Sequence, residues 1–367
     1  MTESQSFLLS LVRMALWGVH ESLPVHTPDW KDVFNQAYRQ TLLGVIADAV
    51  PMLPSDLQPD AQTRQKLYAV ATKIALTHSL LNRKVADIKT RMDNIGINCV
   101  LLKGQGTALN YPNPQSRQCG DIDLYVGDEN FIPVLKHLTP GREKDASYYR
   151  TQKHIDITED GISIEIHRVA DILPGIRQNR LFQQWTENSL QSEALRKVEI
   201  NGVSINLPPT DFDAIYIMNH TWHHFMVGGI GLRQICDWTM HMHRFHDQID
   251  ADALEENLSS FGLTQAWKVI SCIAVKHLGL PEAECPLYDP SYAKKADKAL
   301  EVIWDEGNFG IYSDSRKTRR PKGHFAGKFH SLKVSTSRIV NILSIAPSVV
   351  LHTWIWYCIK GMQNLLK

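Results

Sequence analysis

Three acidic residues occupy positions where their carboxylates can act together. Asp121 and Asp123 lie in the run 121–126, DIDLYV, and Glu165 lies in the run 162–168, which begins ISIEIH. Both runs alternate polar and apolar residues, as strands with one buried face do. Because side chains at i and i+2 of a strand point to the same side, Asp121 and Asp123 project together about 7 Å apart. Glu165 takes the polar side of its own strand.

Carboxylates held this close repel each other unless a cation lies between them. Mg²⁺ prefers oxygen ligands and a site shared with substrate phosphates, and Mn²⁺ is the alternative ion. This combination suits phosphoryl or nucleotidyl transfer, in which the metal orients the nucleophile and neutralises charge at phosphorus. An Asp-x-Asp pair alone also fits a solvated strand end. Gly120, which allows close backbone approach just before the pair, and the third acid Glu165 favour a metal site.

The strands that carry these acids belong to a small sheet unit in a mostly helical chain. Two predicted strands flank Asn201-Gly202, a strong type I′ turn signal, and two others flank 159–161. The predicted strands are 97–103, 121–126, 153–158, 162–168, 196–200 and 203–207. Apolar residues at helical spacing predict helices on both sides. These are two helices within 5–50, then about 60–95, 211–226, 231–247, 251–262, 264–279 and 290–305.

The fold class that follows is α+β, with a small mixed β-sheet core flanked by N-terminal and C-terminal helical regions. Changes of pattern divide the chain into four parts. They are an N-terminal helical region 1–95, the α/β core 96–208, a helical domain 209–310, and a basic linker with a C-terminal apolar helix, 311–367.

The composition is that of an ordinary globular protein, with 43% hydrophobic and 21% charged residues. Lys+Arg and Asp+Glu are both 39, so there is no net basic field to hold long DNA. Six scattered cysteines have no metal-ligand spacing, which favours reduced thiols in a cytoplasmic protein.

Segment 339–359, IVNILSIAPSVVLHTWIWYCI, is the candidate for peripheral membrane contact. It is nearly long enough to span a bilayer, but Asn341, Pro347 and His352 interrupt it. A helix packed on the protein is the first expectation, before an interfacial helix and a true span. The basic run 316–322 is expected to be a solvated loop, with RNA, anionic lipid or polyphosphate as the alternative contact.

Several motifs, taken in order, resemble a known family. LLKG at 101–104 is followed by Tyr-x-x-Pro, an Arg, GDIDLYV at 120–126, a His and Glu-Ile-His. The series resembles the nucleotidyltransferase superfamily of DNA polymerase β and, more narrowly, an uncharacterised bacterial nucleotidyltransferase family. The resemblance spans most of 5–285. The matching residues are Lys103-Gly104, Arg117, Gly120-Asp121-Ile122-Asp123, His154 and Glu165-Ile166-His167.

The resemblance implies transfer of an NMP from an NTP, such as ATP, to an acceptor with release of pyrophosphate. It implies that Asp121 and Asp123 hold two Mg²⁺ ions. Glu165 matches the third carboxylate, which helps to bind the catalytic metal and can accept the proton of the nucleophile. The acceptor stays open among a small molecule, a sugar, a protein and an RNA end.

Four residues are assigned to nucleotide binding on the same resemblance: Lys103, Gly104, Arg117 and Gly120. Gly104 matches the glycine that begins the helix facing the phosphates. The two cations complement the triphosphate, although Lys103 also fits a solvated strand end. The superfamily's glycine-serine pair is Gly104-Gln105 here, and the third acid is Glu instead of the commoner Asp. Both departures leave room for a non-catalytic nucleotide-binding relative.

Six further residues are assigned to the substrate or to the support of the metal ligands: His154, His167, His220, His224, Arg233 and Asp237. His167 shares the polar face of Glu165, so it can hydrogen-bond a carboxylate, contact the substrate or meet a structural partner. His220 and His224 have i,i+4 spacing without the Glu of a zinc motif, so they either face the cleft or pack. Arg233 and Asp237 either form an ion pair along a helix or shape the cleft.

One other class of function remains beside the enzyme and its non-catalytic relative. The apolar segment 339–359 motivates a membrane-associated partner in surface-polysaccharide assembly. That role can coexist with the enzymatic one.

Overall fold

The computed structural model describes residues 1–20, 23, 28–141, 146–191, 193–312, 336, 338 and 342–347. Its helices are α1 (Glu3–Trp17), α2 (Trp30–Arg39), α3 (Leu43–Ala49), α4 (Ala61–Asn94), α5 (Gln105–Ala108), α6 (Gly127–Leu138), α7 (Ala146–Arg150), α8 (Ile176–Leu190), α9 (Thr210–Val227), α10 (Leu232–Phe245), α11 (Ala251–Phe261), α12 (Thr264–Leu278) and α13 (Ala293–Glu306). The strands are β1 (Val100–Leu101), β2 (Asp121–Tyr125), β3 (His154–Glu159), β4 (Ile162–His167), β5 (Arg196–Ile200) and β6 (Val203–Leu207). Short 3₁₀ turns are η1 (Val50–Met52), η2 (Pro114–Ser116), η3 (His246–Gln248), η4 (Glu282–Glu284), η5 (Pro290–Tyr292) and η6 (Asn308–Gly310).

The six strands form one mixed sheet in the order β3-β4-β2-β1-β6-β5. The central pairs β2–β4 and β1–β6 are parallel, whereas β1–β2 and the two hairpins are antiparallel. Each hairpin turns through two residues of positive φ, Asp160-Gly161 and Asn201-Gly202. That backbone matches the right-handed twist of paired strands. The α+β prediction is confirmed.

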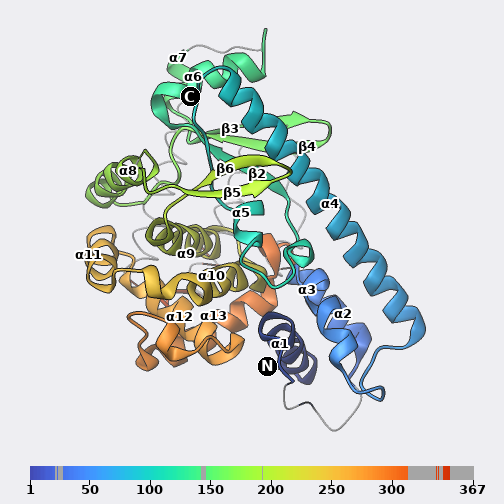
Figure 1. The fold of residues 1–367 in the computed structure, drawn as a ribbon. Coiled ribbons are helices and arrows are strands. Elements are labelled where there is room, and N and C mark those ends of the chain that lie inside the picture. Colours follow the sequence, from blue (N-terminus) through green and yellow to red (C-terminus); the bar gives the residue numbers. More distant parts are fainter. Residues whose placement is uncertain are drawn as a thin grey trace.

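One face of the sheet is covered by α4 and α6. Ile122, Leu124, Ile164 and Ile166 are fully buried in a cluster with residues of these two helices. The 34-residue helix α4 runs along one side of the molecule from the N-terminal helices to the sheet (Figure 1). The side chain of Asp60 caps its first turn. The opposite face of β2 and β4 is therefore left to carry polar groups.

Helices from both ends of the chain share the other large core. A single cluster of buried residues joins α1, α2 and α3 to α9, α10, α12 and α13. Figure 1 shows α9 to α13 stacked beneath the sheet, with α1 to α3 beside them. The four-part division of the chain stays a prediction, but its two helical parts are packed together.

Several local predictions need correction. The segment 5–50 holds three helices instead of two, because the chain also turns at Thr41, which has φ +56. Strand 97–103 shortens to β1, of two residues. The helices α6 and α8 were not predicted. Pro133 lies inside α6, where proline normally signals a break.

The predicted C-terminal elements fall mainly outside the described residues. This applies to the basic run 316–322 and to all of 339–359 except 342–347. Ile342, Ile345 and Ala346 are buried against the helical core. Among the helices that the structure describes, none has the length and hydropathy needed to cross a bilayer.

Candidate metal centre

The pairing of β2 with β4 brings the three predicted carboxylates together. Their parallel register places Asp123 opposite Glu165, with Asp121 two residues earlier on the same face. The three side chains offer carboxylate oxygens that all lie within 4.8 Å of one another. Because the isoleucines between them fill the core on the other side of the sheet, the hydrophobic effect fixes which way the acids point.

Asp123 is the buried centre of this cluster, with 1% of its surface exposed. Its Oδ1 lies 3.0 Å from Lys103 Nζ and 3.0 Å from His167 Nε2. Burial opposes ionisation, but the charge of Lys103 and the hydrogen bond from His167 outweigh it and hold the pKa of Asp123 well below its ordinary value. Its Oδ2 is buried and has no hydrogen-bond partner among the described residues.

That unpartnered oxygen is the observation that fits a cation. A dry carboxylate oxygen without a partner costs free energy, which a metal ion would recover. Asp121 would also gain from a nearby cation, because burial and the charge of Asp123 disfavour its ionised form and raise the pKa of Asp121. An all-oxygen set of this kind is the one that Mg²⁺ prefers. The metal-binding roles stay predictions, but the donor set suits them.

His167 and His154 lie beside the acids. His167 is buried, and its Nε2 donates to Asp123 and to Glu165, each at 3.0 Å. Burial disfavours its charged form, but the two hydrogen bonds prevail and raise the pKa of His167. Of the alternatives for this residue, the structure shows the carboxylate contact, and a contact with the substrate stays a prediction. His154 faces the same group, with Nδ1 3.7 Å from Glu165 Oε2.

Lys103 is turned into the cluster instead of ending in solvent. Besides Asp123, its Nζ contacts His220 Nε2 at 3.1 Å. Burial opposes its charge, but the nearby carboxylates raise the pKa of Lys103. It therefore stays a cation at the site.

The helix expected to begin at Gly104 and face the phosphates is short, and the backbone at Gly104 is in an unusual conformation. Gly104 has φ +65, which a side chain disfavours, and a Cβ there would lie 3.4 Å from the carbonyl oxygen of Asp121. The helix that it begins, α5, has only four residues. Gln105 is buried, with both amide atoms lacking a partner among the described residues. A Cβ at Gly120 would meet nothing within 4 Å, so its own backbone surroundings do not require glycine.

A polar stripe of α9 faces the cluster. The rings of His220 and His224 are 4.4 Å apart. Burial and then the charge of Lys103 hold the pKa of His220 well below its ordinary value and lower that of His224 to about 4. Both rings are neutral at pH 7. His220 also lies against Lys103 of the cluster, and contact of either ring with a substrate stays a prediction.

Three residues at this face were missed in the sequence. Tyr216 lies one turn before His220; its hydroxyl is buried without a partner among the described residues, and burial and the charge of Asp123 raise its pKa. Spacing of i, i+4 along 216, 220 and 224 could have revealed it. Lys153 and Asp171 form an ion pair at 2.8 Å next to His154. No local pattern marks Asp171.

Arg117 is corrected from a phosphate contact to a structural ion pair. Its Nε and Nη2 each lie 2.7 Å from an oxygen of Asp237 on α10, and both residues are buried. Arg233 Nη1 and the Tyr111 hydroxyl also contact Asp237, at 3.2 Å and 2.7 Å. The predicted pair Arg233–Asp237 therefore exists within a larger network. This network ties the loop before β2 to the helical region.

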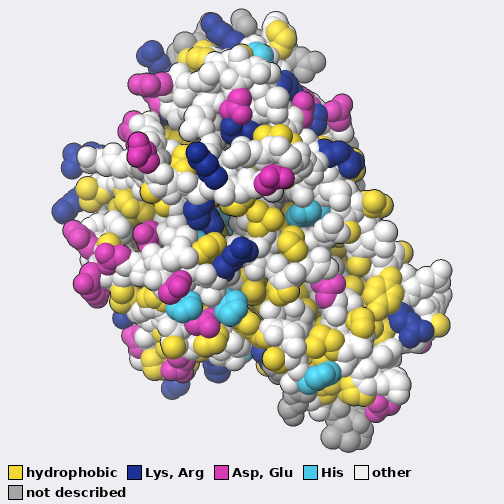
Figure 2. All heavy atoms as spheres, viewed as in Figure 1, with side chains coloured by type: hydrophobic (Ala, Val, Ile, Leu, Met, Phe, Trp, Pro, Cys, Tyr) yellow, Lys and Arg dark blue, Asp and Glu magenta, His cyan; other side chains and the backbone are white. Residues whose placement is uncertain are grey.

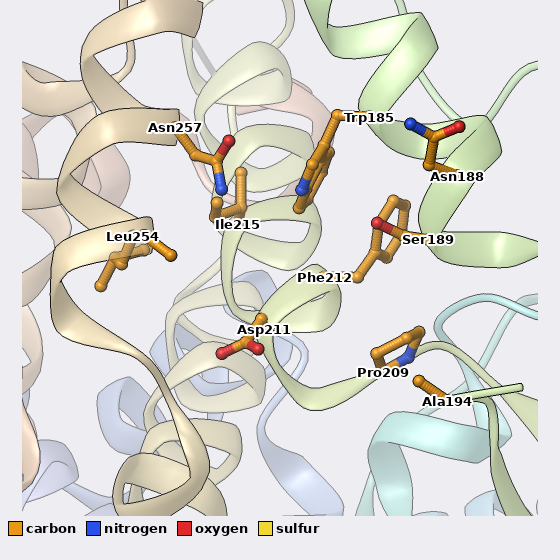
Figure 3. Close-up of a pocket in the computed structure, with 11 residues that line it drawn as sticks. Trp185, Asn188, Ser189, Ala194, Pro209, Asp211, Phe212, Ile215, Leu254 and Asn257 are labelled. Carbon is orange, nitrogen blue, oxygen red and sulfur yellow. The ribbon is translucent and has the colours of Figure 1, made fainter. Parts of the chain in front are cut away.

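A cavity of about 330 Å³ lies apart from the carboxylates, between α8, α9 and α11 (Figure 3). Trp185, Phe212, Ile215 and Leu254 give it apolar walls, and Asn257 is among its polar groups. Trp185 stacks on Phe212 with ring centroids 4.8 Å apart. On the face in Figure 2, both acidic and basic side chains are seen.

Comparison with known proteins is consistent with this geometry. A solved structure from Paracoccidioides brasiliensis, an antigenic nucleotidyltransferase-like protein, is similar at 15% identity and a TM-score of 0.29, over 58% of this chain and 96% of that one. That likeness is too slight to carry an argument. None of the curated proteins matches the chain significantly. The family model described as "Uncharacterised nucleotidyltransferase" matches residues 26–279, which is more than half of the sequence and includes every residue of the cluster. The chain belongs to that nucleotidyltransferase family.

Proposed function

We propose that this protein is a metal-dependent nucleotidyltransferase of the DNA polymerase β-like superfamily, of the bacterial kind that the motifs resemble. It moves an NMP from an NTP to an acceptor and releases pyrophosphate. The observation that carries the proposal is the convergence of three carboxylates, one of which, Asp123, has an unpartnered Oδ2. An acidic cluster of this kind repels a bare triphosphate, so binding needs a cation between them.

Each residue of the cluster has a distinct task in this proposal. Asp121 and Asp123 hold Mg²⁺, with Mn²⁺ as the alternative, and Glu165 completes the site and faces the acceptor hydroxyl. The metal supplies charge neutralisation and orientation of the reacting oxygens. Lys103 adds a fixed positive charge beside Asp123. Gln105 offers a buried amide in place of the superfamily's serine hydroxyl.

Helices α9 and α10 would wall the side from which an acceptor approaches, because His220 on α9 lies against Lys103 of the cluster. The acceptor stays among the four classes named from the sequence, and the proposed location is the cytoplasm, with peripheral membrane contact through 339–359 as a further proposal.

Isothermal titration of each NTP with Mg²⁺ tests the proposal. The wild type is expected to bind at least one NTP only when Mg²⁺ is present. Asp123→Asn is expected to weaken this binding more than about 100-fold. That loss is larger than the one caused by removing a residue that only hydrogen-bonds to a metal ligand. Asp156→Asn is the matched control, because Asp156 pairs with Glu165 across the hairpin but is exposed and outside the cluster. Unchanged affinity in Asp123→Asn would refute the assignment. Binding without pyrophosphate release across acceptor screens would leave the non-catalytic relative.

Lys103 gives a second test, because it separates metal from phosphate. Lys103→Met is expected to weaken NTP affinity about tenfold or more, since it removes a charged contact to phosphate. Affinity for Mg²⁺ alone is expected to hold or rise, because Nζ lies 3.0 Å from a metal-binding oxygen and repels the ion. Lys136→Met, an exposed change on α6, is the control. Equal losses of both affinities would show that Lys103 only maintains the cluster.

A further inference from the structure

A second cluster of potential ligands adjoins the carboxylates, and two of its three members are imidazoles. His154 on β3 and Glu165 and His167 on β4 offer ligand atoms that all lie within 4.8 Å of one another. Glu165 Oε2 is 3.0 Å from His167 Nε2 and 3.7 Å from His154 Nδ1. The antiparallel register that sets His154 opposite His167 creates this arrangement.

The spacing suits a single metal ion. Ligand atoms about 2.1 Å from one ion at tetrahedral angles lie about 3.4 Å apart. The two distances from Glu165 Oε2 lie on either side of that value, so small side-chain rotations are enough. Nδ1 of His154 is also buried and has no hydrogen-bond partner among the described residues. A ring nitrogen left dry and unpaired costs free energy, and a cation would recover it.

We propose that His154, Glu165 and His167 form a second metal site that takes a divalent transition-metal ion, such as Mn²⁺, Co²⁺ or Zn²⁺. Imidazole nitrogen suits these ions, whereas Mg²⁺ prefers the all-oxygen set of Asp121 and Asp123. The site goes beyond nucleotidyl transfer, because it would bind its ion whether or not the chain transfers nucleotides.

The surroundings accept a second positive charge. Nε2–H of His167 now lies between two carboxylates, where the ion would take the place of the proton. Lys153, the cation beside His154 in the sequence, is already paired with Asp171 at 2.8 Å. Glu165 would then be shared by the two sites, as bridging carboxylates are in two-metal centres with ions about 3.5–4 Å apart.

Co²⁺ is the probe, because its visible d–d absorption reports nitrogen ligation and coordination number. The full chain is titrated with CoCl₂ in a large excess of Mg²⁺, and equilibrium dialysis gives the stoichiometry. One equivalent of Co²⁺ that Mg²⁺ does not displace is expected. His154→Gln is expected to weaken its binding at least about tenfold. His154 is 30% exposed, so this variant should fold. His137→Gln, an exposed histidine on α6, is the matched control and should bind like the wild type.

Asp121→Asn separates this site from the proposed nucleotide site. It is expected to keep the Co²⁺ absorption and to lose Mg²⁺-dependent NTP binding. Equal Co²⁺ binding by the wild type and His154→Gln, or complete displacement of Co²⁺ by Mg²⁺, would overturn the inference. Absent NTP binding by the wild type, with the Co²⁺ absorption intact, would refute nucleotidyl transfer alone.

Discussion

Replacing Asp121 with Asn is expected to make the metal-free protein more stable while abolishing its stabilisation by Mg²⁺. Asp121 lies beside Asp123 and Glu165, and among the described residues it forms no ion pair with Lys103, the cation of the cluster, which is paired with Asp123. Burial and the charge of Asp123 raise its pKa, so its ionised form destabilises the fold near neutral pH. Removing that charge should stabilise the fold by about 1 kcal/mol, or roughly 2 °C in Tm.

The pH dependence gives this prediction a sign. A carboxyl whose pKa is raised by folding costs nothing while it is protonated in both states, below about pH 3. The cost builds as the pH rises from the unfolded-state pKa to the higher folded-state pKa, and it is constant above that. The gain of Asp121→Asn over wild type should therefore vanish below about pH 3 and be complete at pH 7.

Thermal unfolding with and without Mg²⁺ checks both halves of the prediction. The wild type should gain Tm as Mg²⁺ is added, because an ion that binds only the folded state stabilises it by mass action. Asp121→Asn should start higher and gain nothing. Asp156→Asn should follow the wild type in both respects. A lower metal-free Tm for Asp121→Asn would show that the carboxylates are not under mutual repulsion.

Replacing Arg117 with Ala is expected to destabilise the protein by about 3–5 kcal/mol, the cost of breaking a buried ion pair from one side. Asp237 would lose two hydrogen bonds of 2.7 Å and, among the described residues, keep those from Arg233 and Tyr111. Circular dichroism on heating should show a fall in Tm on the order of 10 °C.

The double variant Arg117→Met with Asp237→Leu is the control for this explanation. Apolar groups of similar size need no counter-charge, so the pair should recover most of the lost stability. Arg117→Lys should recover less, because an ammonium cannot bind both oxygens in the planar fork geometry of Arg. A near-normal Tm for Arg117→Ala together with weaker NTP binding would restore the phosphate contact predicted from the sequence.

The part of the candidate site that the sequence predicts is the part that depends on alternating polar and apolar residues within single strands. Asp121, Asp123 and Glu165 follow from polar residues placed between buried isoleucines and leucines, and the hairpin turns follow from Asp160-Gly161 and Asn201-Gly202. Helix α4 likewise follows from an apolar stripe at helical spacing. In these cases the residues that determine the strand face, the turn or the helix all lie within one short segment of the chain.

The rest depends on residues distant in the chain. Arg117 and Asp237 are 120 positions apart, so the motif revealed the Arg without its partner. The contact between Lys103 and His220, 117 positions apart, was hidden for the same reason. The burial of His167 could not be foreseen either, because it depends on which strand pairs with β4.

The parallel register of β2 and β4 also limits how this molecule can change. The side chains of these strands point alternately into the hydrophobic core and toward the face that carries the carboxylates. Deleting one residue within β4 would therefore move each following side chain to the opposite face, and a deletion before Glu165 would turn Glu165 into the core. Substitutions at the apolar positions can be tolerated one by one if volume is kept, whereas length within the strands cannot vary at all. Insertions and deletions that preserve the cluster are therefore confined to the connections.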